Sequence, residues 1–193
     1  PNVGKSSLFN ALTGLHQHTG NWPGKTVATA AGTCSIDGAA VELIDLPGTY
    51  SLSARSPEEE VAAEYISFGC ADAVIVVCDA TALERNLYLA LQVMEITDHV
   101  VICVNLMDEA EKRGIAVDLP RLSQLLGVRV VGTSARQKKT LPPLLRAAVA
   151  AAQERHRKPV PVRYGEAIEA GLFSIEARLD ELLPGSMPNH RWI

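Results

Sequence analysis

Short apolar runs alternate with amphipathic stretches along most of this chain. Continuous apolar runs of strand length lie at 73–78 and 100–104, and a final strand is expected over 128–133. Runs of this kind are typical of strands that are buried on both faces of a parallel sheet. Amphipathic stretches with helical spacing lie at 83–97, 119–126 and 141–155. The alternation predicts an α/β fold with a mostly parallel, doubly wound sheet.

The beginning of the chain has a different pattern. A helix is expected over 6–12, and a turn-rich segment follows at 16–24. Two short strand-like runs, 33–36 and 41–44, are separated by Asp37-Gly38, a pair that favours a hairpin turn. This part of the chain therefore predicts a loop followed by a β-hairpin.

An acidic helix is expected over 57–67. Pro57 suits its first turn, and Ser56 suits its N-cap. The run Glu58–Glu60 is interpreted as a solvated helix face whose charges lie favourably near the helix N-terminus.

The pattern also indicates where the domains divide. Around 156–161 the chain becomes basic and rich in proline, which is typical of a linker, and 165–183 is helical in pattern. We expect a main domain over 1–157 and a small, incomplete helical unit over 158–193.

Composition narrows the class of protein. The chain has 193 residues, of which 47% are hydrophobic, so one ordinary core can form. A net charge of −4 argues against a broad nucleic-acid-binding surface. No apolar run approaches the roughly 18 residues needed to span a bilayer, and the polar start does not resemble a signal peptide. The four scattered cysteines form no CxxC pair, so we expect a reducing cytoplasm.

The first chemical motif is Gly4-Lys5-Ser6 at the start of the predicted helix. In a phosphate-binding loop, backbone N–H groups surround a phosphate, the lysine reaches its oxygens and the serine binds Mg²⁺. The complete motif has another glycine five positions before Gly4 and follows a strand. We expect both to precede Pro1, since without them the sheet lacks a central member.

The second motif is Asp45-Leu46-Pro47-Gly48, directly after a predicted strand. Open α/β sheets bind ligands at this edge. The aspartate there suits a magnesium-bound water, and the N–H of Gly48 suits a γ-phosphate. The alternative is an ordinary proline-glycine turn.

Two further motifs follow the later strands and indicate the base. The carboxylate of Asp108 in Asn105-Leu106-Met107-Asp108 fits the paired N–H donors of guanine, which adenine lacks. Asn105 is expected to tie this loop to the phosphate loop. Backbone N–H groups of Thr133–Arg136 suit the guanine oxygen. The alternative role for Asp108 is a helix cap.

The segment Gly20–Val27 is a candidate switch loop. It needs a threonine whose hydroxyl meets Mg²⁺ and whose N–H meets the γ-phosphate. Thr26 is preferred by position, and the alternatives are Thr13, Thr19 and Thr29. Trp22 either packs down and anchors this loop or lies exposed. The nearby His16 and His18 favour solvated side chains over a metal pair.

Together these segments resemble the cytoplasmic G domain of the ferrous-iron transport protein B (FeoB) family. The stretches that carry the resemblance are PNVGKSSLFNALTG, GNWPGKTV, DLPGTYSL and LERNLYLALQ, with Tyr164 and Arg191-Trp192 near the end. GNWPGKTV and LERNLYLALQ are the specific ones, since the others are shared by many GTPases. The resemblance implies a Ras-like P-loop GTPase fold with a C-terminal helical subdomain like a guanine-nucleotide dissociation inhibitor.

The resemblance also implies partners and cofactors. It implies GTP or GDP with Mg²⁺, and K⁺ held by Asn2, although Asn2 is alternatively a loop-stabilising residue. It implies an attached transmembrane permease region at the cytoplasmic face of the bacterial inner membrane. A homo-oligomer and small cytoplasmic iron-transport partners are further options, and no nucleic acid is expected.

Two departures bear on the mechanism. Thr49 stands where Ras-like enzymes carry a water-orienting glutamine, so slow intrinsic GTP hydrolysis is expected, with water positioned by backbone groups or by Thr49. The K⁺ that the resemblance implies at Asn2 is expected to stimulate it. Lys25 replaces an aliphatic residue that is usual in the family, which leaves the switch-loop conformation open.

The resulting site assignment has three parts. The expected nucleotide-binding residues are Pro1, Asn2, Val3, Gly4, Lys5, Ser6, Ser7, Gly24, Lys25, Thr26, Asp45, Leu46, Pro47, Gly48, Asn105, Met107, Asp108, Ser134, Ala135 and Arg136. The expected catalytic residues are Asn2, Lys5, Thr26, Gly48 and Thr49. The expected magnesium ligands are Ser6, Thr26 and Asp45.

Three other functions stay open at this point. A non-catalytic guanine-nucleotide sensor is consistent with Thr49 in place of glutamine. A GTPase of ribosome or tRNA biogenesis would need a basic appendage, which the charge disfavours. An ATP-dependent kinase is disfavoured by Asp108.

Overall fold

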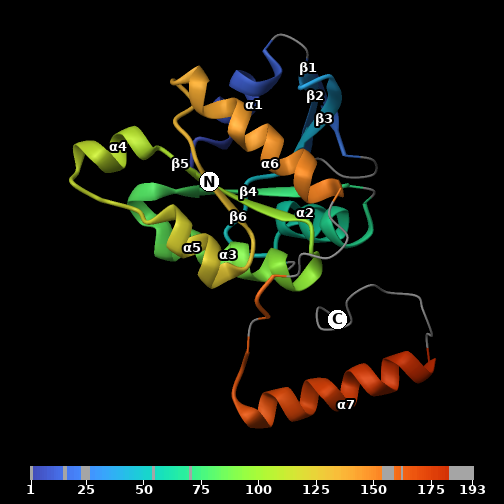
Figure 1. The fold of residues 1–193 in the computed structure, drawn as a ribbon. Helices are drawn as coiled ribbons and strands as arrows, with labels where there is room; N and C mark the ends of the chain where they lie inside the picture. Colours follow the sequence, from blue (N-terminus) through green and yellow to red (C-terminus); the bar gives the residue numbers. More distant parts are fainter. Residues whose placement is uncertain are drawn as a thin grey trace.

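The structure is a computed structural model that describes residues 2–14, 17–22, 27–53, 55–69, 71–153, 159–161 and 163–182. Its described strands form two three-stranded sheets, with the orders β1-β2-β3 and β4-β5-β6. Helices pack around them, and the last helix lies apart from the α/β body (Figure 1). The predicted α/β class is confirmed.

The first sheet is antiparallel and consists of β1 (Gln17–Asn21), β2 (Ala28–Ile36) and β3 (Ala39–Asp45). The turn between β2 and β3 has positive φ at Asp37 (48°) and Gly38 (83°), which suits a tight hairpin and confirms the prediction. Sequence analysis placed only a turn-rich loop where β1 lies, and this was wrong. Pairing with β2 makes this polar stretch a strand, because ladder hydrogen bonds need no apolar side chains.

The second sheet is parallel and consists of β4 (Val74–Asp79), β5 (Val100–Asn105) and β6 (Arg129–Gly132). All six residues of β5 are buried, as its continuous apolar run predicts. One face packs on α3 (Leu83–Ile96) and α5 (Leu119–Leu126), and the other on α6 (Leu141–Gln153) and α1 (Lys5–Thr13). Helices on both faces confirm the doubly wound arrangement (Figure 1).

The remaining described helices are α2 (Pro57–Phe68), α4 (Met107–Lys112), α7 (Glu166–Leu182) and the short 3₁₀ turns η1 (Ala80–Ala82) and η2 (Lys138–Thr140). Ser56 caps α2 as predicted, because its hydroxyl accepts a hydrogen bond from the backbone N–H of Glu59 at 3.2 Å. The structure adds α4, which the sequence analysis did not predict, since six residues are too few to show helical periodicity. No described helix is both long and apolar enough to span a lipid bilayer.

Each sheet has two edge strands without a second described neighbour, and the edges of β3 and β4 bear on the site. In the described ladders β3 pairs only with β2, and β4 pairs only with β5. A largely apolar groove runs along β4, and it is lined by Val74, Val76, Leu46, Leu52 and Leu89 among others. Val3 at the start of the chain also lines it.

Candidate nucleotide site

The phosphate-loop motif lies at the N-terminus of α1. Gly4 precedes the helix with φ of 76°, and Asn2 also has a positive φ of 64°. Among the described residues no side chain caps α1, so the N–H groups of its first turn have no described capping partner. Because such groups carry the positive end of the helix dipole, this end of α1 is suited to a phosphate. Ser6 and Ser7 are exposed in this first turn.

Lys5 connects the phosphate loop to the second motif. Its ammonium group forms an ion pair with the carboxylate of Asp45, the last residue of β3, and donates a hydrogen bond to the Leu46 carbonyl at 2.7 Å. Two motifs separated by 40 positions are thus in contact. The site thus has a positively charged ammonium group next to a carboxylate, and carboxylate oxygens are ligands that Mg²⁺ prefers.

Asn105 connects the phosphate loop to the third motif, as the sequence analysis expected. It is fully buried at the end of β5, and its side-chain N–H₂ donates to the Val3 carbonyl at 3.0 Å. Its side-chain oxygen accepts from the Thr133 hydroxyl, also at 3.0 Å. A Cβ atom on Gly4 would lie 2.6 Å from this N–H₂ group, so only glycine fits there. The close approach fixes the distance between the two loops.

The third and fourth motifs also touch each other. The backbone N–H of Met107 donates to the Thr133 carbonyl, and the N–H of Asp108 donates to the Ser134 hydroxyl, both at 3.1 Å. The N–H of Ser134 donates in turn to the Thr140 hydroxyl at 3.1 Å. Asp108 lies in the first turn of α4, which begins after Leu106 at φ of 62°. These bonds hold Asp108 at the same sheet edge as the phosphate loop.

The loop after Gly48 is held by side chains of two helices. The Thr49 hydroxyl donates to the Ser51 carbonyl at 2.5 Å and lies 3.4 Å from a carboxylate oxygen of Glu59 on α2. The guanidinium carbon of Arg85 on α3 lies 4.1 Å from the centroid of the Tyr50 ring. The expected catalytic threonine therefore has its hydroxyl engaged within its own loop.

Comparison with known proteins identifies the family. The family model described as "Ferrous iron transport protein B" matches residues 1–148. The chain belongs to this family. FeoB membership, inferred above from the motifs, is thereby confirmed.

Curated FeoB relatives align over much of the chain. A protein of Porphyromonas gingivalis named as a fusion of Fe(2+) transport protein A and Fe(2+) transporter FeoB is 40% identical over 193 residues, which is 97% of this chain and 23% of that protein. FeoB of Escherichia coli K12 is 47% identical over 135 residues, 68% of this chain and 18% of that protein. The chain thus spans about a quarter or less of these relatives.

Solved FeoB structures share the fold. The cytosolic domain of Thermotoga maritima FeoB, described as a GDP form, superposes with a TM-score of 0.92 at 39% identity and covers 100% of this chain and 75% of that one. The Legionella pneumophila FeoB cytosolic domain gives 0.89 at 36% identity, with 100% and 75% covered. The predicted Ras-like P-loop fold is confirmed by these matches.

Several predicted site residues lie outside the described part of this FeoB chain. These are Pro1, Gly24, Lys25 and Thr26, and His16 lies outside it as well. Among the threonine alternatives, the structure argues against Thr13, which is 2% exposed and donates its hydroxyl to the Phe9 carbonyl inside α1. Trp22 packs its ring edge-on against Tyr65 of α2, with 5.0 Å between ring centroids.

Sequence reasoning missed several supporting side chains of the FeoB site. Glu59 is half-buried and contacts Thr49, so the acidic run is not uniformly a solvated face, although Glu58 and Glu60 are exposed. The Thr133 side chain, Thr140 and Arg85 also had no assigned role. Arg85 lies within LERNLYLALQ, whose specificity was the available signal.

Proposed function

We propose that this chain is the guanine-nucleotide-binding domain of a ferrous iron transporter. The observation that carries the proposal is the convergence on the N-terminus of α1, where Asn105 bonds Val3 and Lys5 meets Asp45. One point of the sheet edge thus joins a phosphate cradle, a lysine and a base-reading loop. Relatives whose structures are described as GDP and GMPPNP forms support the same ligand.

Guanine is selected by Asp108 in this proposal. Its carboxylate accepts from the ring N–H and the exocyclic amine, while the backbone N–H groups of Ala135 and Arg136 face the guanine oxygen. The N–H of Ser134 is not used for the base, because it donates to the Thr140 hydroxyl. Adenine presents an acceptor and no matching donor pair, so it leaves the carboxylate unpaired. Met107 supports the base loop through its bond to Thr133.

In this proposal the residues around the phosphates carry out GTP hydrolysis. Lys5 holds the phosphate oxygens, and the N–H of Gly48 senses the γ-phosphate. The oxygen donors Ser6 and Asp45 fit Mg²⁺, which when bound neutralises the phosphate charge. The side-chain oxygen of Asn2 suits K⁺ beside the phosphates. Turnover is slow, because Thr49 is less suited than glutamine to orient water.

The domain arrangement completes the proposal. Residues 1–157 form the G domain, and 158–193 begin a helical subdomain that slows GDP release. A strand preceding Pro1 fills the groove along β4, since Val3 lines that groove and the edge of β4 lacks a described partner. A transmembrane permease region follows and places the domain at the cytoplasmic face of the bacterial inner membrane. Released switch loops regulate iron uptake through it.

The test is nucleotide competition on the full-length protein. GTP and GDP are expected to displace a fluorescent GDP, and ATP is expected to fail at concentrations about a hundredfold higher. Asp108→Asn should weaken guanine binding by about a hundredfold, since an amide cannot accept both N–H groups. Glu109→Gln, next to it on α4, is the matched control. Equal displacement by ATP would refute the guanine assignment.

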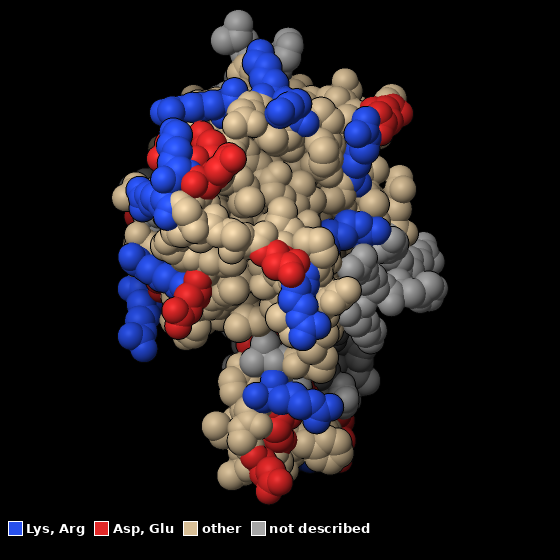
Figure 2. Space-filling model, turned by 60° about the vertical axis from the view of Figure 1, so that its left-hand side comes forward, with Lys and Arg blue, Asp and Glu red and all other residues tan. Residues whose placement is uncertain are grey.

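A non-catalytic nucleotide sensor is the second candidate. The observation that favours it is the Thr49 hydroxyl, which is engaged by Ser51 and Glu59. Turnover of GTP separates the two functions, because a sensor binds tightly and releases no phosphate. On the face shown in Figure 2, basic and acidic side chains are interspersed, so nothing there favours an RNA-binding GTPase.

A further inference from the structure

Helix α3 contacts the loop after Gly48 at two points. The Arg85 guanidinium covers the Tyr50 ring, and the side-chain oxygen of Gln92 accepts a hydrogen bond from the backbone N–H of Leu52 at 3.0 Å. Arg85 and Gln92 are seven positions apart, so they lie on one face of the helix. The loop is therefore fastened along the length of α3.

Leu52 adds a third attachment through its side chain. It is 2% exposed and packs in the same core cluster as Ala90, Val93 and Met94 of α3. A buried leucine and a satisfied backbone N–H make this the fixed end of the loop. Tyr50 is 43% exposed and is free to change its contacts.

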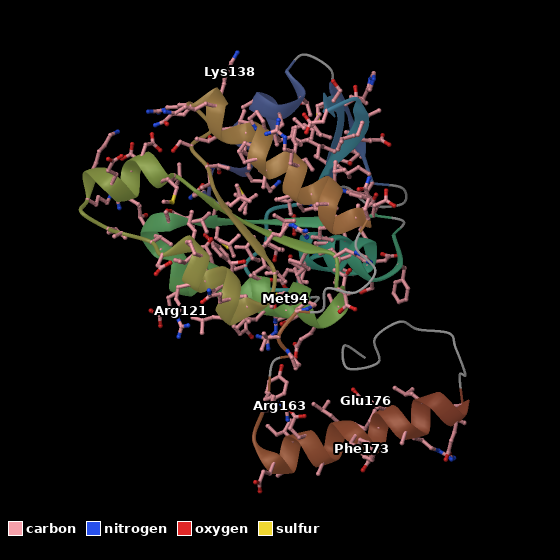
Figure 3. The ribbon with its side chains drawn as sticks, viewed as in Figure 1. Met94, Arg121, Lys138, Arg163, Phe173 and Glu176 are labelled. Carbon is pink, nitrogen blue, oxygen red and sulfur yellow. The ribbon has the colours of Figure 1, made fainter. Side chains whose placement is uncertain are left out.

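The far end of α3 contacts the linker to α7. The Tyr164 hydroxyl donates to the carboxylate of Glu95 in the last turn of α3 at 2.8 Å, and the Tyr164 backbone N–H donates to Glu169 of α7 at 2.8 Å. In Figure 3 the linker at Arg163 lies below the end of α3 that carries Met94. Tyr164 thus joins α3 and α7.

We propose that α3 is the connection through which α7 and the loop after Gly48 influence each other, with Gln92 and Tyr164 as positioning residues at its two ends. The inference rests on the proposed function for its meaning, since that loop is the one that would sense a γ-phosphate. A single 14-residue helix, packed on β4 and β5, moves as a rigid body. A shift at Glu95 is therefore felt at Gln92, one turn away.

Linkage makes the effect reciprocal. If formation of the Tyr164 contact changes nucleotide affinity by some factor, nucleotide binding changes the equilibrium of that contact by the same factor. Loss of the Tyr164–Glu95 bond should then alter the ratio of GTP to GDP affinity. A helical unit that slows GDP release would act by this route.

The experiment is amide hydrogen exchange on the full-length protein, because the Leu52 N–H is itself the donor to Gln92. Tyr164→Phe removes one hydroxyl and should raise the Leu52 exchange rate about threefold or more. Tyr88→Phe makes the same change at an exposed site on α3 and should leave the rate unchanged. Glu95→Gln keeps an oxygen that can accept from the Tyr164 hydroxyl, so it should leave the Leu52 exchange rate unchanged.

A double-variant cycle completes the test. Gln92→Met should raise Leu52 exchange directly, and adding Tyr164→Phe should raise it no further, because the two changes act on one connection. Additive effects, or a Tyr164→Phe rate equal to that of Tyr88→Phe, would overturn the proposal. The exchange readout needs no nucleotide, so a protein that binds no guanine nucleotide would refute the proposed function while the coupling is still decided.

Discussion

The side-chain N–H₂ of Asn105 donates to the carbonyl of Val3 at 3.0 Å, across 102 positions of sequence. The contact is possible because Gly4 has no side chain: a Cβ there would lie 2.6 Å from the same nitrogen. The loop after β5 and the loop before α1 are thus set at one distance. In the proposed function, that distance decides whether the base and phosphates of one nucleotide are held together.

Gly4→Ala should therefore separate nucleotide binding from stability. The substitution strains the positive φ of 76° and displaces Asn105, and we expect nucleotide affinity to fall by about tenfold or more. Gly114→Ala is the control, because its φ of 70° carries the same strain with no described atom within 4 Å of the new Cβ. Titration with fluorescent GDP checks the affinities, and urea unfolding checks the stability. Equal affinity in the two variants would contradict the argument.

Asn2 should decide the response to potassium. We expect GTP turnover of the full-length protein to be about tenfold or more higher in KCl than in NaCl at equal ionic strength. Asn2→Gly removes the side chain while tolerating the φ of 64°, and it should make turnover equal in both salts. Phosphate release is the measurement. Turnover of the unchanged protein that is fast in NaCl and no faster in KCl would contradict the potassium role of Asn2.

Trp22 should tolerate phenylalanine and not alanine. The Trp22 Nε1 is buried without a hydrogen-bond partner among the described residues, so removing this nitrogen breaks no described hydrogen bond. Trp22→Phe also keeps an aromatic ring in contact with Tyr65. We expect Trp22→Phe to unfold within about 1 kcal/mol of the unchanged protein and Trp22→Ala to lose about 2 kcal/mol. Urea unfolding followed by circular dichroism measures both. A cost for phenylalanine as large as that for alanine would reveal a partner of Nε1.

The buried thiols of the parallel sheet should resist alkylation. Burial raises the pKa of Cys78 to about 12, and burial likewise raises that of Cys103 to about 12. The reactive thiolate is therefore scarce in the folded protein at pH 9. Iodoacetamide labelling with peptide mapping should modify both residues only after unfolding. Rapid labelling without unfolding would contradict the burial.

The same shifts predict a loss of stability in alkali. The folded thiols stay protonated while unfolded ones ionise near their ordinary value of 9.0, so unfolding becomes easier as pH rises from there to about 12. Their stabilising contribution is complete below pH 9.0. Cys78→Ala should weaken this pH dependence, as measured by the free energy of unfolding across the interval. An unchanged slope would show that other groups control it.

Sequence reasoning predicted the elements whose side-chain pattern is strong. The apolar runs of β4 and β5 and the amphipathic α3 and α5 lie where expected, since burial on two faces or on one stripe dictates composition. It failed at β1, where Gly20 and Asn21 pair with Thr29 and Ala28 through backbone groups alone. Turn-forming residues there masked a strand that its neighbour specifies.

At the candidate site, the motifs could be recognised in the sequence, but the side chains that hold them in place could not. Lys5, Asp45, Asn105 and Asp108 stand out because each belongs to a pattern at the end of a strand or the start of a helix. The role of the Thr133 side chain depends on β6 lying beside β5, which places its hydroxyl 3.0 Å from the Asn105 oxygen. Such contacts depend on how distant segments are brought together by the fold.

The edge of β4 that has no described neighbour has a consequence for how the chain behaves at high concentration. Its sequence VIVVCD, over Val74–Asp79, is rich in β-branched residues and has one acidic side chain. Backbone groups without a described partner on such a strand are a template for another chain, and the edge of β3 is a second one in the part of the chain that the structure describes. Any preparation in which the adjoining groove is not filled should therefore form edge-to-edge aggregates. The strand that we propose to fill this groove would cover the edge of β4 and so prevent its pairing with other chains, in addition to supporting the nucleotide.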